Sequence, residues 1–364
     1  MKAQGPLKGV KVLEFVGLGP APFCAMMLAD MGADVVRIDR PGAHGGGAAE
    51  VLARGRRSIS LNMKDAADLA ICRELIGKAE ILIEGFRPGV MERLGLGPDA
   101  AFALNPALVY GRMTGWGQTG PLAQAAGHDI NYISLTGALG AIGTSETPVP
   151  PLNLVGDFGG GAMYLAFGVM AGLVHARATG EGQVVDAAIV DGATSLMSSQ
   201  HQLAAMGLWS TRRGENLLDG GAHFYGVYRC ADGGHVSIGP LEPQFYALLM
   251  EKLGIDPVSM PGSWSPEGWA GAKARLAEVF LGKTRDEWCA LLEGSDVCFA
   301  PVLNYEESPL HPHMSARGVY QEIEGVRQAA PAPRFSRTPG AIQGPAPKPG
   351  ADREAILADW SVRS

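Results

Sequence analysis

The chain has 364 residues, of which 46% are apolar and 18% are charged; this composition is typical of folded globular proteins and excludes a disordered chain. Its length exceeds one ordinary hydrophobic core, so two domains are expected. The net charge of −7 argues against general nucleic-acid binding.

The first half of the chain alternates between short apolar runs and helical patterns. Buried strands are predicted at 10–15, 33–38, 58–61, 80–83 and 107–112. Helical periodicity is found between them at 21–31, 65–78 and 88–94. Strands that alternate with helices imply a parallel sheet covered on both faces. The sequence therefore predicts a large Rossmann-like α/β domain over residues 1–190.

The start of this domain resembles a dinucleotide-binding fold, with Gly17 and Gly19 after the first strand and Asp39 after the second. However, Pro22 occupies the position of the third glycine of that fingerprint, and Arg40 suits a phosphate better than a ribose diol. We expect the first turn of a doubly wound fold without nicotinamide binding.

The pattern changes beyond residue 190. A helical stretch at 189–207 and a polar loop lead into the second half, and residues 191–222 are predicted as a linker. Residues 223–328 are predicted as a smaller α+β domain, with a hairpin at 224–239 and helices at 242–253, 269–281 and 285–293. Thr284 is the expected N-cap of the last helix. Residues 329–364 are predicted as a tail that returns to the large domain, extended where Pro and Gly crowd 329–350.

The five cysteines are widely spaced and form no C-x-x-C pair, which predicts neither a disulfide framework nor a zinc site. The first residues lack the apolar run of a signal peptide, and the last residues are not a peroxisomal address. Glycines interrupt the most apolar stretch, 158–175, so no membrane span is expected. These features together predict a cytoplasmic protein.

His128 precedes an amphipathic helical pattern at 130–139. Near a helix N-terminus, free backbone N–H groups and the helix dipole favour a negative oxygen such as that of a thioester enolate. An isolated histidine is more often a capping or core residue. The neighbours Gly127 and Asp129, together with the carboxylate at position 157, favour proton transfer instead.

Asp157 stands in a glycine-rich turn before a helical pattern at 163–176. An N-cap is a common role for Asp at such a place, but the three glycines at 159–161 also allow a ligand to approach closely. An imidazole and a carboxyl on opposite sides of one carbon can take a proton from one face and deliver one to the other. A racemase that works next to a carbonyl needs this arrangement.

Glu242 lies where the predicted hairpin meets the first helix of the small domain. Its local sequence favours an acidic residue of a helix's first turn, whereas contact with an imidazole would fix the tautomer of that ring. Basic residues at predicted strand ends are either solvated or form a phosphate-binding rim; they are Arg37, Arg40, Arg54, Arg56, Arg57, Lys64, Arg87 and Arg93. No Walker motif, metal-ligand cluster or G-x-S-x-G turn is present, which predicts proton transfer without a metal or cofactor.

Several segments together resemble the family III CoA-transferase (CaiB/BaiF) superfamily, and most closely its α-methylacyl-CoA racemase branch. The matching segments cover nearly the whole chain and lie at 7–15, 32–41, 82–90, 113–121, 127–132, 153–161 and 242–246. The most specific of them are G-H-D-I-N-Y at 127–132 and N-L-V-G-D-F-G-G-G at 153–161.

The resemblance implies a racemase that interconverts (2R)- and (2S)-2-methylacyl-CoA thioesters, with CoA as part of the substrate and no separate cofactor. His128, oriented by Glu242, would be one acid/base and Asp157 the other, while the amide of Asp129 would hold the thioester oxygen. It also implies an interlocked homodimer, in which each active site lies between the large domain of one subunit and the small domain of the other.

Further residues match positions with binding roles in the family. Contacts with CoA phosphates or adenosine are implied for Arg40, Lys64 and Arg93, and more weakly for Arg54. A methionine-rich surface for the acyl chain would draw on Met163, Met197 and Met206, although buried methionine is more often part of the core.

The nearest alternative is a CoA transferase of the same fold, in which the aspartate at position 157 is a nucleophile that forms an acyl anhydride. Such enzymes typically lack the histidine of the G-H-D segment and carry a glycine-rich loop where this chain has 239–243. A non-catalytic acyl-CoA-binding protein would need the carboxylates to be structural. His128 and Glu242 together favour the racemase, and the identity of the acyl chain stays open.

Overall fold

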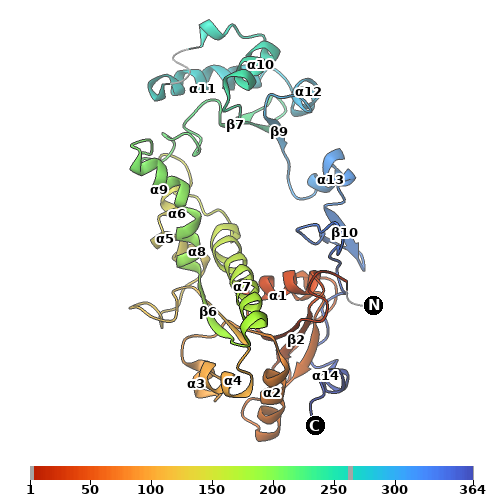
Figure 1. Ribbon diagram of the computed structural model, residues 1–364. Coiled ribbons are helices and arrows are strands. Elements are labelled where there is room, and N and C mark those ends of the chain that lie inside the picture. Colours follow the sequence, from red (N-terminus) through yellow and green to blue (C-terminus); the bar gives the residue numbers. More distant parts are fainter. Residues whose placement is uncertain (1–3, 261–264, 364) are drawn as a thin grey trace. The chain divides into compact units, whose positions relative to one another are not determined.

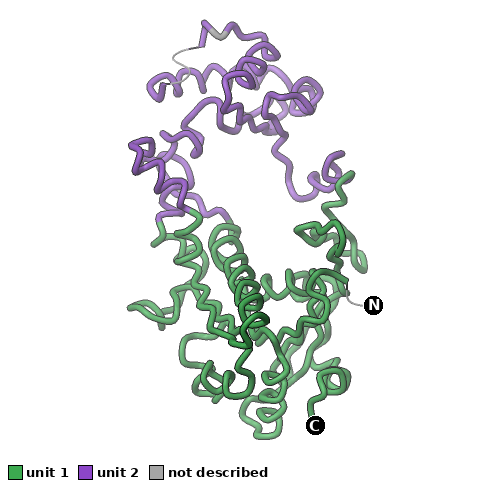
Figure 2. The backbone as a smooth tube through the Cα atoms, in the orientation of Figure 1, with its two compact units in different colours: residues 1–136, 152–196, 316–364 green, residues 137–151, 197–315 purple. Residues whose placement is uncertain are grey.

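The computed structural model describes residues 4–260 and 265–363 (Figure 1). Contacts divide the chain into two compact units, coloured separately in Figure 2. Unit 1 comprises residues 1–136, 152–196 and 316–364, and unit 2 comprises residues 137–151 and 197–315. The two units are defined by contacts, whereas the boundaries predicted at 190, 222 and 328 were meant for independently folding domains. Those boundaries therefore stay a prediction.

Unit 1 is built on a six-stranded parallel sheet. Its strands in chain order are β1 (Lys11–Phe15), β2 (Asp34–Asp39), β3 (Arg57–Ser60), β4 (Ile81–Glu84), β5 (Val109–Thr114) and β6 (Gln183–Ala188). Their spatial order is β3-β2-β1-β4-β5-β6, and each neighbouring pair is parallel. The order reverses between β1 and β4. In such sheets, ligands usually bind outside the carboxyl ends of the strands at this reversal.

Helices cover both faces of the sheet. The helical elements of unit 1 are α1 (Pro20–Asp30), η1 (Val51–Ala53), α2 (Ala66–Lys78), α3 (Val90–Arg93), α4 (Pro98–Leu104), α5 (Asp129–Leu135), the π-helix η2 (Leu154–Ala162), α7 (Met163–Thr179), α8 (Ile189–Leu196) and α14 (Arg353–Asp359). Because side chains alternate along a strand, Val12 and Val35 pack with α1 and α7, whereas Leu13 and Val36 pack with α2 and α14. The predicted Rossmann-like α/β fold is confirmed.

Two elements near the C-terminus complete unit 1. The antiparallel pair β10 (Tyr320–Ile323) and β11 (Val326–Ala329) was not anticipated from the sequence, and neither was α14. Residues between β11 and α14 are irregular, with a bridge from Ala346 to Gly47. The Asp352 carboxylate accepts a hydrogen bond from the Ser58 N–H at 2.9 Å, which fixes the start of α14 beside β3.

Unit 2 has a three-stranded antiparallel sheet of β7 (Gly226–Arg229), β8 (His235–Ile238) and β9 (Phe299–Val302), in that order. Its helical elements are α6 (Ala138–Ala141), α9 (Ser198–Ala205), α10 (Pro243–Leu253), η3 (Pro257–Ser259), α11 (Pro266–Phe280), α12 (Arg285–Leu292), η4 (Ser308–Leu310) and most of α13 (Pro312–Ala316). The core contains Leu249, Leu276 and Phe280. Thr284 caps α12 as predicted, because its side chain accepts a hydrogen bond from the Glu287 N–H.

One continuous helical run among the described residues, Leu154–Thr179, is long and apolar enough to cross a membrane by length and composition alone. Its side chains Leu165, Val169 and Leu173 belong to the core of unit 1, and 39% of its most apolar window is buried. Because the core helix of a soluble protein passes the same test, this run is weak evidence for a membrane span.

Candidate active site

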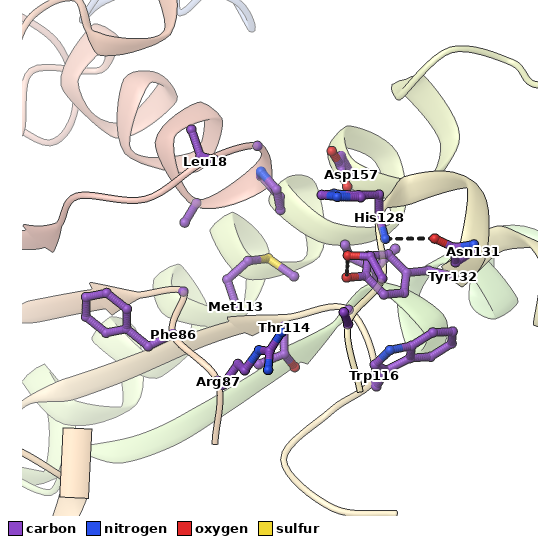
Figure 3. Close-up of a pocket in the computed structure, with 18 of the residues that line it drawn as sticks. Leu18, Phe86, Arg87, Met113, Thr114, Trp116, His128, Asn131, Tyr132 and Asp157 are labelled. Carbon is purple, nitrogen blue, oxygen red and sulfur yellow. Dashed lines mark hydrogen bonds between the residues drawn. The ribbon is translucent and has the colours of Figure 1, made fainter. Parts of the chain in front are cut away.

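A pocket of about 560 Å³ lies in unit 1 where the strand order reverses. It is lined by residues 18–21 after β1, 85–88 after β4 and 113–116 at the end of β5. His128 and Asp157 also line it, and Figure 3 shows their side chains at the same end of the cavity. The fold therefore brings together the two side chains that the sequence singles out for proton transfer.

His128 is the residue immediately before α5, and its backbone is held on both sides. Its N–H donates to the Asn131 Oδ1 at 3.0 Å, and its carbonyl accepts from the Asn131 N–H at 2.8 Å. The preceding carbonyl, that of Gly127, accepts from the Tyr132 hydroxyl. The exposed imidazole therefore projects into the pocket from a fixed backbone.

Tyr132 and Trp116 form an aromatic pair beneath this backbone, which the sequence analysis did not single out. The two rings are arranged edge to face, and their centroids lie 4.7 Å apart. Gly115 and Gly127 make room for the Tyr132 ring, because a Cβ at these positions would lie 2.0 Å and 2.7 Å from its atoms. The G-H-D-I-N-Y segment is thus a packing unit in which the residues after His128 fix its position.

Asp157 lies inside the π-helix η2, so the interpretation of Asp157 as an N-cap is wrong; Asn153 precedes the helix instead. π-Helical segments are rare in proteins, and those that occur are often found at functional sites. The Asp157 carboxyl lies close to the start of α1, because a Cβ at Gly19 would be 3.1 Å from its Oδ2. The ring of the next residue, Phe158, stacks on that of Phe23 in α1, with the ring centroids 4.3 Å apart, and this contact anchors η2 against α1.

The surroundings of Asp157 change its protonation. Burial, followed by the neighbouring Asp129 carboxylate, raises the pKa of Asp157 to about 6, against the opposing effect of the His128 imidazole. A carboxyl with this pKa exists in both protonation states near neutral pH. It can therefore donate a proton in one step and accept one in another.

Asp129 contributes its side chain as well as its backbone. Its Oδ1 accepts a hydrogen bond from the Asp157 N–H at 2.6 Å. Gly156 permits this contact, because a Cβ there would lie 2.2 Å from the same oxygen. The contact joins the start of α5 to η2, and thereby fixes His128 and Asp157 relative to each other.

Glu242 belongs to unit 2, whereas the described residues that line the pocket belong to unit 1. It is the residue before α10, one position ahead of the predicted first turn, and its exposed side chain makes no capping hydrogen bond. Burial, together with Glu242, raises the pKa of the Cys298 thiol. Because the Glu242 carboxylate is exposed and does not cap α10, it is accessible to another group.

A second cavity of about 800 Å³ adjoins the first and shares Leu18, Gly19 and Phe86 with it. Arg40 lines this cavity and is exposed. Lys64 follows β3 and Arg93 ends α3, and both are exposed. These three predicted cations are therefore accessible to an anionic ligand.

Arg54 is placed differently from the other predicted cations. It is only 2% exposed, and its guanidinium donates to the Asp30 carboxylate at 2.5 and 3.1 Å. It also donates to the Gln328 side chain and the Ala329 carbonyl, each at 2.8 Å. These hydrogen bonds join α1 to β11. Because the donors are engaged and almost no surface is accessible, the position of Arg54 contradicts its predicted contact with CoA.

The methionines named for an acyl surface are split between the units. Met163 begins α7 in unit 1 and is half exposed, whereas Met197 and the exposed Met206 flank α9 in unit 2. Within the described part of the chain, no group of three or more His, Cys, Asp or Glu side chains is arranged to hold a metal ion.

Comparisons with known proteins relate this chain and its fold to one family. The chain matches CoA-transferase family III over residues 7–353. It is 43% identical to α-methylacyl-CoA racemase from Mus musculus, covering 98% of this chain and 91% of the relative, and 45% identical to α-methylacyl-CoA racemase from Homo sapiens, covering 92% and 87%. The crystal structure of a CAIB/BAIF family protein from Brucella suis superposes with a TM-score of 0.83 at 25% identity, covering 98% of this chain and 100% of that chain. The chain therefore belongs to CoA-transferase family III.

Proposed function

We propose that the protein interconverts (2R)- and (2S)-2-methylacyl-CoA thioesters by moving the proton on the α-carbon. One observation carries this proposal: an imidazole and a carboxyl whose pKa is raised to about 6 line one pocket at the reversal of the strand order. The similarity to two relatives that are named α-methylacyl-CoA racemase supports the same reaction.

In the proposed reaction, the neutral imidazole of His128 removes the α-proton from one enantiomer. The electron pair of the broken C–H bond moves toward the thioester oxygen and leaves a planar enolate. Protonated Asp157 then donates its proton to the opposite face of the α-carbon. The enzyme is left with a protonated His128 and an ionised Asp157, which is the state required for the reverse direction.

The enolate oxygen needs a donor, because the α-proton of a thioester is only weakly acidic. We assign this role to the backbone N–H of Asp129, the first residue of α5. The first N–H groups of a helix have no partner within the helix, and the helix dipole favours a negative oxygen there. Hydrogen-bond donors fixed before the reaction stabilise developing charge without reorganisation.

Arg40, Lys64 and Arg93 are the proposed contacts for the CoA phosphates, because each is an exposed cation and Arg40 lines the second cavity. The second cavity would then receive the nucleotide part, and the pantetheine arm would pass Leu18 and Phe86 into the pocket. CoA is part of the substrate in this proposal, and no separate cofactor is invoked.

We further propose a homodimer in which Glu242 of one subunit orients His128 of the other. Both side chains are exposed, and the Glu242 carboxylate makes no capping hydrogen bond with α10. The outward face of α7 supports a partner copy, because Phe167 is 76% exposed and Val174 is 70% exposed. Residues seven positions apart share one face of a helix, and large exposed apolar patches commonly mark an interface.

Exchange of the α-proton with solvent deuterium separates the three candidate functions. In D₂O without an acceptor acid, a racemase incorporates deuterium at the α-carbon from either enantiomer of a 2-methylacyl-CoA. A CoA transferase incorporates none, but moves CoA when a free acid is added. A binding protein does neither. Absence of deuterium from both enantiomers, measured by mass spectrometry, would refute the proposed function.

Gly156→Ala is expected to lower kcat for racemisation by about 10²-fold, because the new Cβ would displace the Asp129 carboxylate and shift η2. Chiral analysis of the product measures this effect. Gly140→Ala in α6 is the matched control and should retain wild-type kcat, because a Cβ there meets no atom within 4 Å. Equal kcat values in the two variants would contradict the importance of this contact.

A further inference from the structure

The Asp129 carboxylate has a place in the site that its backbone role does not explain. It lies against η2, where Oδ1 accepts from the Asp157 N–H at 2.6 Å. The absence of a side chain at Gly156 is what allows this approach. A negative charge is therefore held beside the residue that acts as an acid in the proposed reaction.

This placement is unfavourable for the enolate itself. Like charges repel, so a carboxylate near the enolate raises the energy of that anion. The Asp129 side chain therefore does not stabilise the reacting anion directly. It does favour a neutral group nearby, and the Asp157 carboxyl must be neutral in order to donate its proton.

Charged and titratable groups face Asp157 from several elements. They are His128, Asp129 and Tyr132 on α5 or just before it, and Arg87 after β4. The first turn of α1 carries no acidic side chain. Burial is the largest cause of the raised pKa of Asp157, the Asp129 carboxylate raises it further, and the His128 imidazole lowers it. Asp129 is the neighbouring carboxylate that contacts the Asp157 backbone.

We propose that Asp129 is a positioning residue with two effects on Asp157: its Oδ1 fixes the backbone, and its charge keeps the Asp157 carboxyl protonated in a larger fraction of molecules. This inference rests on the proposed function. The His128–Asp157 pair can hold a single proton in two ways, on the carboxyl or on the imidazole. Both forms contain the same number of protons, so neighbouring charge rather than pH sets their ratio. Asp129 favours the form in which His128 is ready to act as the base.

Three substitutions at this position separate the charge from the hydrogen bond. Asp129→Asn keeps an oxygen that can accept from the Asp157 N–H but removes the charge. Asp129→Ala removes both, and Asp129→Glu keeps the charge at a displaced position. Asp191→Asn is the matched control, because it removes an exposed carboxylate from α8, which packs on η2. For each full-length variant, kcat/KM for both enantiomers of a 2-methylacyl-CoA is measured across about pH 5 to 9.

Removal of the Asp129 charge should move the bell-shaped profile of the Asn variant to lower pH by about half a unit or more, because the apparent pKa values of the pair fall. On the alkaline limb, kcat/KM should then drop at least about three-fold. The Ala variant should show the same displacement with a lower maximum. The Glu variant should keep the wild-type limbs, even where its maximum is reduced.

Two results would overturn the proposal. One is an Asn variant whose limbs coincide with those of the wild type, because Asp129 would then act through its hydrogen bond alone. The other is an equal displacement in Asp191→Asn, because the effect would then reflect general charge. A wild-type protein that does not racemise the substrate would refute the proposed function instead, so the two failures are distinguishable.

Discussion

Asp157→Asn and His128→Ala are each expected to lower kcat for racemisation by about 10²- to 10⁴-fold, the range that one general acid or base contributes. Racemisation needs a proton carrier on each side of the α-carbon, and both side chains line the pocket. Neither variant should lose exchange with solvent completely. Each should still incorporate deuterium from the single enantiomer whose α-proton faces the remaining group, and the two variants should prefer opposite enantiomers.

The opposite preference is what identifies a mechanism with two proton carriers. Chiral analysis measures racemisation, and mass spectrometry measures deuterium in each recovered enantiomer. Affinity for CoA should stay at the wild-type value in both variants, because the proposed phosphate contacts are Arg40, Lys64 and Arg93. Wild-type racemisation by His128→Ala would contradict the assignment. Full CoA transfer by that variant, with loss of transfer in Asp157→Asn, would favour the transferase.

Much of the large domain could be predicted from local sequence, because a buried parallel strand appears as a short apolar run. The runs predicted at 10–15 and 33–38 correspond to β1 and β2 within one residue at each end. The sixth strand, β6, was missed. Gln183, Val184 and Asp186 are exposed on this edge strand, so the segment lacks the apolar continuity of the buried strands.

Helix interruptions depended on single residues that periodicity does not resolve. The pattern at 130–139 is divided between α5 and α6, because Gly137 adopts a left-handed conformation with φ 83°. The pattern at 189–207 is likewise divided between α8 and α9. Hydrophobic spacing continues across both breaks, so it predicts a helical segment but not the point at which the chain turns.

The sequence singled out two side chains that line the pocket, but it did not predict their contacts. His128 and Asp157 stand in distinctive segments, but the π-helical setting of Asp157 and the contact of its N–H with Asp129 depend on packing between segments 28 residues apart. Arg54 shows the same limit. Its partner Gln328 lies 274 residues away, and without this contact the side chain has the same local features as an exposed cation.

Replacing Arg56 by Met is expected to lower the free energy of unfolding by about 3–5 kcal/mol, because it leaves a buried carboxylate without its counter-charge. Glu14 is 0% exposed, and its carboxylate oxygens lie 2.5 and 3.3 Å from the Arg56 guanidinium. Arg56 also donates to the carbonyls of Pro22 and Leu52, which belong to α1 and η1. Loss of Arg56 would therefore loosen the wall of the second cavity, and it would leave the buried Glu14 carboxylate without a counter-charge.

The pH dependence of this loss provides the stricter test. Burial raises the pKa of Glu14, and Arg56 opposes that effect. In Arg56→Met the folded-state pKa of Glu14 should rise further above its unfolded value, so stability is retained at low pH and lost as pH rises through the folded-state pKa. Urea unfolding at about pH 5 and pH 8 should therefore show a larger deficit at the higher pH. The double variant Glu14→Gln/Arg56→Met should remove this pH dependence, because it has no buried carboxyl at position 14. If Arg56→Met were as stable as the wild type at the higher pH, Arg56 would not be needed to compensate the charge of Glu14.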